Sequence, residues 1–256
     1  MIVMRRFLFL VTPATLLIAL ASVAHAADPN TQNQSPAAVV KMDTDYKIGD
    51  RYGYRTQDLF SGMGDDRFTL RVTGLADNQV IFNDGFWVTD RLGNDLAIDD
   101  YNRISEQQIF VPEYGVGRKW TTRYQLIKED DKFVVTLEFE VVARERITVP
   151  AGTFDAYRIE GSGFMHQVRG FRMSACREKA GKFKIWVAPG EVRRFIAKEY
   201  TQRGAPLGCR YSVLERTELV YFQQDGRLTG DDSRPGSEKV IPGDVTLPQY
   251  GGLGRP

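Results

Sequence analysis

Cysteine and histidine are scarce in this chain, whose 256 residues include two of each. His25 lies in the N-terminal segment that we expect to be removed on export, which leaves His166 as the histidine of the mature chain. Metal centres built on several His or Cys ligands are therefore not expected. The sequence also has no G-x-S-x-G nucleophile elbow, no C-x-x-C pair, no Walker A loop and no G-x-G-x-x-G. The run Gly161-Ser162-Gly163 lacks the spacing of the elbow. These absences lower the expectation of an enzyme, although acid–base chemistry by paired carboxylates survives them.

A strong excess of charge of one sign is also missing. The formal net charge is +1, which gives no indication of a dedicated nucleic-acid-binding protein. A hydrophobic fraction of 42% and a charged fraction of 26% are typical of a globular protein and exclude a wholly disordered chain. The length allows one large domain or two small ones.

The first 26 residues have the pattern of a secretory signal peptide. Arg5-Arg6 forms a positively charged start, residues 7–21 are mostly apolar, and Ala24-His25-Ala26 is a small-x-small cleavage site. The apolar run is short and interrupted by proline, which argues against a retained membrane anchor. We therefore expect a periplasmic protein that is cleaved near Ala26 and then has no integral membrane span.

Composition divides the rest of the chain. Residues 27–45 are rich in Asn, Gln, Pro and Ala, and residues 225–256 contain seven Gly and four Pro. Such segments bury too little apolar surface to offset their ordering entropy. We predict a disordered linker over 27–45, a folded β domain over 46–223 and a disordered tail over 224–256.

Within the folded domain the hydrophobic period is two. Phe68, Leu70 and Val72 alternate with polar residues, and long alternating runs follow at 133–143 and 182–187. This pattern is typical of antiparallel strands with one wet face. It predicts an all-β fold with few or no long helices, in which a curved antiparallel sheet closes into an open or half barrel. The expected strands lie near 52–59, 67–73, 78–90, 119–127, 133–148, 153–165, 182–187, 192–201 and 210–222.

Two segments hint at an internal duplication. Residues 48–52 resemble 116–120, and residues 65–68 resemble 130–133. In each copy a Gly turn enters an aromatic strand and a charged turn enters an alternating one. The domain consists either of two related halves, 46–115 and 116–223, or of hairpins that share ordinary turn chemistry.

The run V-P-A-G-T-F at 149–154 predicts a hairpin, because Pro150 sets φ for the first corner and Gly152 accepts a positive φ. Together with W-V-A-P-G-E-V-R-R at 186–194 and Leu219-Val220-Tyr221, it resembles a family of exported bacterial β-proteins of unknown function. The resemblance covers about 116–222 and implies a curved sheet or open barrel in the periplasm. It supplies no catalytic residues.

Cys176 and Cys209 form an even pair in a chain expected to be exported. In an oxidising compartment such a pair predicts one disulfide bond. Two buried free thiols are the alternative.

A basic segment stands out in the second half of the chain, with eleven basic and three acidic residues between Arg169 and Arg210. Lys182, Lys184 and Trp186 share one face of an expected strand, because side chains alternate. Arg193 and Arg194 follow the next turn and can extend the patch. These five residues are candidates for contact with an anionic lipid or envelope component; a solvated strand face is the alternative.

Other candidates have plainer explanations. The three tryptophans Trp87, Trp120 and Trp186 line either a ligand cavity or the core. His166 receives no role. An acidic stretch contains Asp84, Asp90, Asp95, Asp99 and Asp100. Its spacing does not match a calcium-binding loop, so we expect these residues to form turns rather than a Ca²⁺ site.

We thus expect no cofactor, no metal and no nucleic-acid partner. The favoured function is an exported periplasmic, non-enzymatic binding or accessory protein of the cell envelope. The alternative is a carboxylate-based periplasmic hydrolase acting on glycans. A third possibility is an interaction module whose C-terminal tail docks another chain.

Overall fold

The computed structural model describes residues 39–62, 65–99, 102–129, 131–170, 177–204 and 212–233, all within the compact unit Ala37–Pro256. In these ranges the chain forms strands and one three-residue 3-10 helix, η1 (Asn83–Gly85). The strands are β1 (Val40–Lys41), β2 (Arg51–Asp58), β3 (Asp66–Ala76), β4 (Gln79–Phe82), β5 (Trp87–Asp90), β6 (Asp95–Ile98), β7 (Asn102–Ser105), β8 (Glu113–Tyr114), β9 (Lys119–Lys128), β10 (Asp131–Val149), β11 (Gly152–Arg169), β12 (Glu178–Val187), β13 (Phe195–Gly204), β14 (Ser212–Gln224) and β15 (Arg227–Gly230).

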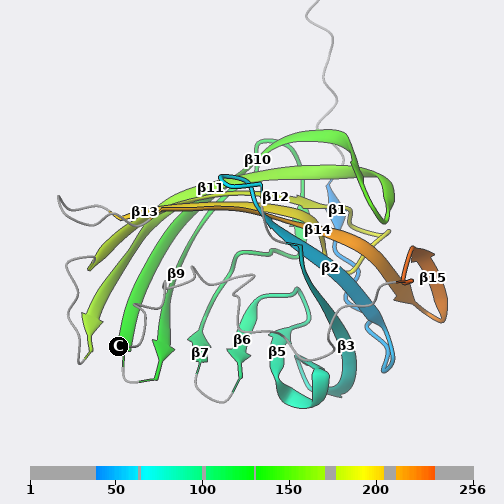
Figure 1. Cartoon of the computed structure of the whole chain (residues 1–256), viewed down its shortest axis with the longest axis horizontal. Coiled ribbons are helices and arrows are strands. Elements are labelled where there is room, and N and C mark those ends of the chain that lie inside the picture. Colours follow the sequence, from blue (N-terminus) through cyan, green and yellow to red (C-terminus); the bar gives the residue numbers. More distant parts are fainter. Residues whose placement is uncertain are drawn as a thin grey trace, which may run out of the picture. The chain divides into compact units, whose positions relative to one another are not determined.

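The main sheet is antiparallel and closed. Its order is β13-β12-β11-β10-β9-β7-β6-β5-β4-β3-β2-β14-β15, and β13 also pairs with β14. Because β15 pairs only with β14, the other twelve strands of this thirteen-stranded sheet form a barrel. Figure 1 shows the long strands β10 to β14 arching over one side, while the short strands β5, β6 and β7 lie on the other.

The all-β prediction is confirmed, but the expectation of an open or half barrel is wrong. The correction comes from the pairing of β13 with β14, which runs from Ala197↔Glu218 to Arg203↔Ser212. Closure gives the terminal strands partners and removes two exposed edges. Nothing in the local sequence of either strand specifies that partner.

The apolar side chains of alternating strand residues point into the barrel and form the core. In β10 the residues Phe133, Val135, Leu137, Phe139 and Val141 are buried, as the period of two predicts. Aromatic rings fill much of the interior and pack against one another, as in the stacked pair Tyr54–Phe195 with ring centroids 4.6 Å apart. Most polar residues of β9 to β12 lie on the outer face, whereas Thr122, Gln167 and Lys179 are buried.

The predicted hairpin at 149–154 is present. It joins β10 to β11 through Pro150 and Ala151, with Val149 paired to Gly152. Gly152 has a φ of 143°, a value that an L side chain rarely adopts. This hairpin positions β11, which carries the central residues of the site described below.

The backbone supports the duplication hypothesis. The amide of Gly49 donates to the carbonyl of Val72, and the amide of Gly117 donates to that of Val141, both at 2.8 Å. Both glycines have positive φ, 95° and 89°. A bulge follows Val72 in β3 and Val141 in β10. β2–β3 and β9–β10 therefore share these backbone features, and the duplication stays a prediction.

Several elements differ from the expected boundaries. The single strand expected over 78–90 is divided into β4 and β5 by η1, where Asp84 and Gly85 have positive φ. Strand β1 lies in the range 27–45 and β15 in the range 224–256, both of which composition predicts to be disordered. β15 forms because Asp225-Gly226, with φ of 51° and 78°, makes a tight hairpin turn.

In the described part of the chain, no helix reaches the length and hydrophobicity that crossing a membrane requires.

Candidate functional site

The strand at 182–187 has the orientation that its alternation predicts. Phe183, Ile185 and Val187 are buried, and Lys182 and Lys184 are exposed on the outer face of β12. Trp186 shares the parity of the lysines but is only 7% exposed. Its Nε1 donates to Glu145 Oε1 at 2.8 Å, and the Arg216 guanidinium lies 5.3 Å from its ring centroid. The indole is thus covered by charged side chains and does not project from the surface.

Arg193 does not belong to the expected patch, because it is buried in an ion-pair network. Its guanidinium donates to Asp43 at 2.8 Å, to Asp50 at 2.9 Å and to Asp225 at 2.8 Å. Burial by itself lowers the pKa of Arg193, but the hydrogen bonds that it donates to Asp225 and Asp43 outweigh burial and raise the pKa above the usual value. The side chain therefore connects distant parts of the barrel.

Arg194 is also buried, among aromatic rings. Its guanidinium lies 5.0 Å from the ring centroid of Phe82, 6.0 Å from that of Trp87 and 5.9 Å from that of Phe195. Burial alone lowers its pKa, whereas the nearby Tyr46 and Tyr54 hydroxyls raise it, with a net upward shift. Of the five predicted contact residues, only Lys182 and Lys184 share an exposed surface.

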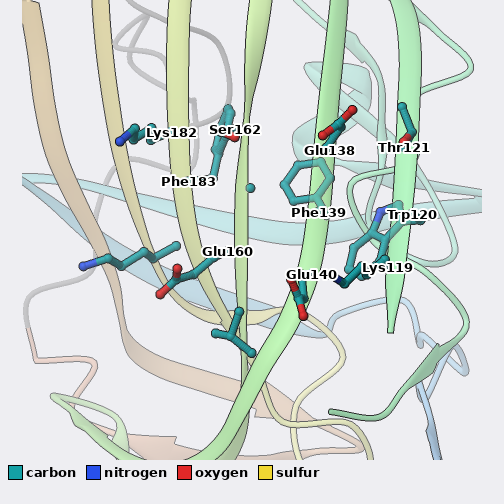
Figure 2. A pocket seen from close by; sticks show the side chains of 13 residues that line it. Lys119, Trp120, Thr121, Glu138, Phe139, Glu140, Glu160, Ser162, Lys182 and Phe183 are labelled. Atoms are coloured by element: carbon teal, nitrogen blue, oxygen red, sulfur yellow. Dashed lines mark ion pairs between the residues drawn. The ribbon is translucent and has the colours of Figure 1, made fainter. Parts of the chain in front are cut away.

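The outer face of β9 to β13 contains an open groove. One part has a volume of about 730 Å³ and crosses β9 to β12. A second part of about 500 Å³ continues over β10 to β13. Both parts are lined by Glu138, Ser162 and Lys182. The polar lining forms two cross-strand rows, Thr121–Glu138–Ser162–Lys182 and Lys119–Glu140–Glu160–Lys184 (Figure 2).

Two glycines in β11, Gly161 and Gly163, lie at positions where a side chain would collide with β10. A Cβ at Gly161 would overlap the Phe139 ring, and a Cβ at Gly163 would overlap the carbonyl oxygen of Thr136. The Phe139 ring, visible at the centre of Figure 2, stacks on Trp120 with ring centroids 5.4 Å apart. Gly161 and Gly163 thus let β10 and its Phe139 ring approach β11 closely, while Ser162 points to the outer face.

Charges in the first part of the groove are paired. Lys119 Nζ lies 3.2 Å from Glu140, and Lys184 Nζ lies 3.4 Å from Glu199. Glu160 forms an ion pair with Arg158. These contacts neutralise most of the charge that the two rows carry.

The second part is different. Lys182 and Arg203 line it and make no ion pair with any described residue. Phe164, on the adjacent strand β11, lines the same part and is 57% exposed. Sequence reasoning missed Phe164, although a large apolar residue at a polar position of an alternating strand is a recognisable signal. Arg203 lies within the basic segment between Arg169 and Arg210, but its position on the sheet could not be predicted from the sequence.

The three glutamates that line the groove, Glu138, Glu140 and Glu160, are ion-paired or exposed. A general acid must hold its proton near neutral pH, which requires burial and distance from cations. Glu140 and Glu160 have cationic partners, and Glu138 is exposed.

Within the described ranges, no group of three or more His, Cys, Asp or Glu residues is arranged to hold a metal ion. The acidic stretch instead organises turns. Asp90 accepts hydrogen bonds from the amides of Leu92 and Asn94, and Asp95 accepts one from Trp87 Nε1 at 2.7 Å. Trp87 itself is buried in the core.

Cys176 and Cys209 both lie outside the described residues, so their pairing stays a prediction. The neighbouring strand ends are close together: Lys179 pairs with Gly204, and Arg203 pairs with Ser212.

No protein-family model and no curated protein matches the sequence. Two crystal structures are similar to it. One is of a candidate exported protein with a YmcC-like fold from Bacteroides fragilis, with 12% identity, a TM-score of 0.35, and coverage of 75% of this chain and 99% of that one. The other is of a candidate lipoprotein from Parabacteroides distasonis, with 10% identity, a TM-score of 0.40, and coverage of 76% and 100%. Similarity at this level assigns neither a family nor an activity.

Proposed function

We propose that this chain is an exported, non-enzymatic binding or accessory protein of the bacterial cell envelope, and that the groove on β9 to β13 binds its partner. Export is supported by the signal-peptide pattern of residues 1–26. Binding is supported by the groove, whose carboxylates lack the surroundings of an acid–base pair.

One observation carries the proposal: Phe164 is exposed inside the groove, whose lining on the neighbouring strands β12 and β13 includes Lys182 and Arg203. The core does not use this ring, because it lies on the outer face of β11. Three hydroxyl groups line the same part, those of Thr136, Ser162 and Thr201. An apolar surface beside a few cationic and hydroxyl groups is the usual composition of a binding site.

Native mass spectrometry of the protein purified from periplasm tests this function. We expect a bound species in the unaltered protein and its loss in the variant Phe164→Ser/Lys182→Gln. The variant Lys41→Gln/Arg227→Gln, which changes exposed cations outside the groove, should keep the species. A protein that carries nothing and gains no mass from envelope extracts would contradict the proposal.

A further inference from the structure

Arg123, Phe164 and Arg203 lie in one row that crosses five neighbouring strands of the sheet. Strand register places Arg123 beside Thr136, Thr136 beside Phe164, Phe164 beside Ala180, and Ala180 beside Arg203. Neighbouring strands are about 4.8 Å apart, so the two arginines lie about 10 Å to either side of Phe164. Lys182 lies on the same face of β12, in the next row.

Positive charge at this line is not neutralised by the described residues. Arg123, Lys182 and Arg203 make no ion pair in these ranges, and the carboxylate that lines the same part of the groove is that of Glu138. Lys119 and Lys184, at the other part of the groove, are paired with Glu140 and Glu199. Among the lysines and arginines that line the groove, those without an ion pair to a described residue thus lie in the part that contains Phe164.

Large apolar side chains project from the same face. Phe164 is 57% exposed, Val168 46% and Ile127 40%. Phe164 and Val168 share the outer face of β11, and Ile127 shares that of β9 with Arg123. These side chains face outward and are not part of the barrel core. Exposed apolar groups interspersed with cations are typical of a surface that contacts a partner.

We propose that this face, formed by Arg123, Ile127, Phe164, Val168, Lys182 and Arg203, docks on the surface of an anionic phospholipid bilayer. The proposal rests on the proposed binding function and names its partner. Lipid phosphates attract the three cations, while the apolar side chains enter the boundary between headgroups and acyl chains. A free phosphate would engage the cations but leave Phe164, Val168 and Ile127 in water.

Vesicle flotation tests the proposal with protein purified after export. One set of vesicles contains equal parts of phosphatidylglycerol and phosphatidylcholine, and the other phosphatidylcholine alone. We expect binding to the anionic vesicles that weakens as salt increases. Each cation at an anionic surface contributes roughly fivefold in affinity, so Lys182→Gln/Arg203→Gln should bind about thirtyfold more weakly. Phe164→Ser should reduce binding about tenfold.

The matched control is Lys41→Gln/Arg227→Gln, which removes the same charge from exposed positions of β1 and β15. It should bind within about threefold of the unaltered protein, since long-range attraction is screened. Equal binding to both vesicle types, equal loss in both double variants, or displacement by millimolar glycerol phosphate would each overturn the proposal. If flotation fails while native mass spectrometry still shows a groove-dependent ligand, the lipid assignment falls and the binding function stands.

Discussion

Arg193 shows at the scale of single residues how one side chain joins separate segments. Asp43 precedes β2, Asp50 lies in the turn before it, and Asp225 lies in the β14–β15 turn. The guanidinium and Asp50 are almost fully buried, with side-chain exposures of 5% and 3%. Removing one member of such a network leaves buried charges without partners.

We therefore predict that Arg193→Ala lowers the free energy of unfolding by about 3–5 kcal/mol, measured by urea denaturation. Arg144→Ala is the control, because Arg144 pairs with Asp155 at 2.6 Å with both side chains about half exposed. The control should cost no more than about 1 kcal/mol. Similar losses of unfolding free energy in both variants would show that the Arg193 network stabilises the protein no more than an exposed ion pair does.

Lys179 provides a test of pH dependence. Burial lowers its pKa to about 8, with a further contribution from Lys128. The folded state thus holds fewer protons than the unfolded state between about pH 8 and the normal lysine pKa. Stability should therefore rise with pH across that window and stay level, at its lower value, below it.

Lys179→Met should remove this rise and stabilise the protein at pH 7 by roughly 1–2 kcal/mol, allowing for partial solvent screening. Urea denaturation of both proteins between pH 7 and pH 10 measures the difference. Parallel stability curves for the two proteins would show that Lys179 is not the titrating group.

Strand β11 carries a prediction at the scale of elements. Gly163 and Gly181 are paired across β11 and β12, yet they differ in the space available for a methyl group. A Cβ at Gly163 would overlap the Thr136 backbone, whereas a Cβ at Gly181 would lie 3.5 Å from the Tyr200 ring, an ordinary contact.

We expect Gly163→Ala to cost about 2–3 kcal/mol and to disturb the groove, because the backbone must move. Gly181→Ala should change stability by less than about 1 kcal/mol. Thermal unfolding of the two variants measures the difference. A Gly163→Ala protein as stable as the unaltered one would show that β10 and β11 can move apart to accommodate the methyl group.

The cysteine prediction also concerns elements, because β12 begins just after Cys176 and β14 begins just after Cys209. Peptide mapping without reduction should recover the two cysteine-containing peptides as one linked species. Replacing both residues by serine should lower stability by roughly 3–4 kcal/mol. Recovery of both peptides as free thiols from periplasmic protein would contradict the bond.

At the scale of the whole molecule, export has a direct test. N-terminal sequencing of protein recovered from periplasm should begin at Ala27, because cleavage is expected after Ala26. Substituting Ala26→Leu should block processing and leave the longer form in the membrane fraction. An intact N-terminus in soluble periplasmic protein would refute the cleavage.

Local sequence determined most of the strands and the direction of their side chains. Alternation in β10 and β12 identified which residues face the core, and Pro150 with Gly152 identified the longest hairpin. These features depend on neighbours within a few residues, and a period of two reports them directly. The Asp225-Gly226 turn also depends on local sequence. It was not predicted, because the Gly- and Pro-rich composition of residues 224–256 indicated disorder.

Tertiary structure alone decided barrel closure, the burial of Arg193 and Arg194, and the composition of the groove. Arg193 meets Asp50 and Asp43 across 143 and 150 residues of sequence. The groove combines residues of five strands, and Arg123 comes near Phe164 only through the register of β9, β10 and β11. Such partners are selected by long-range pairing, in which each strand's position depends on every other strand of the closed sheet.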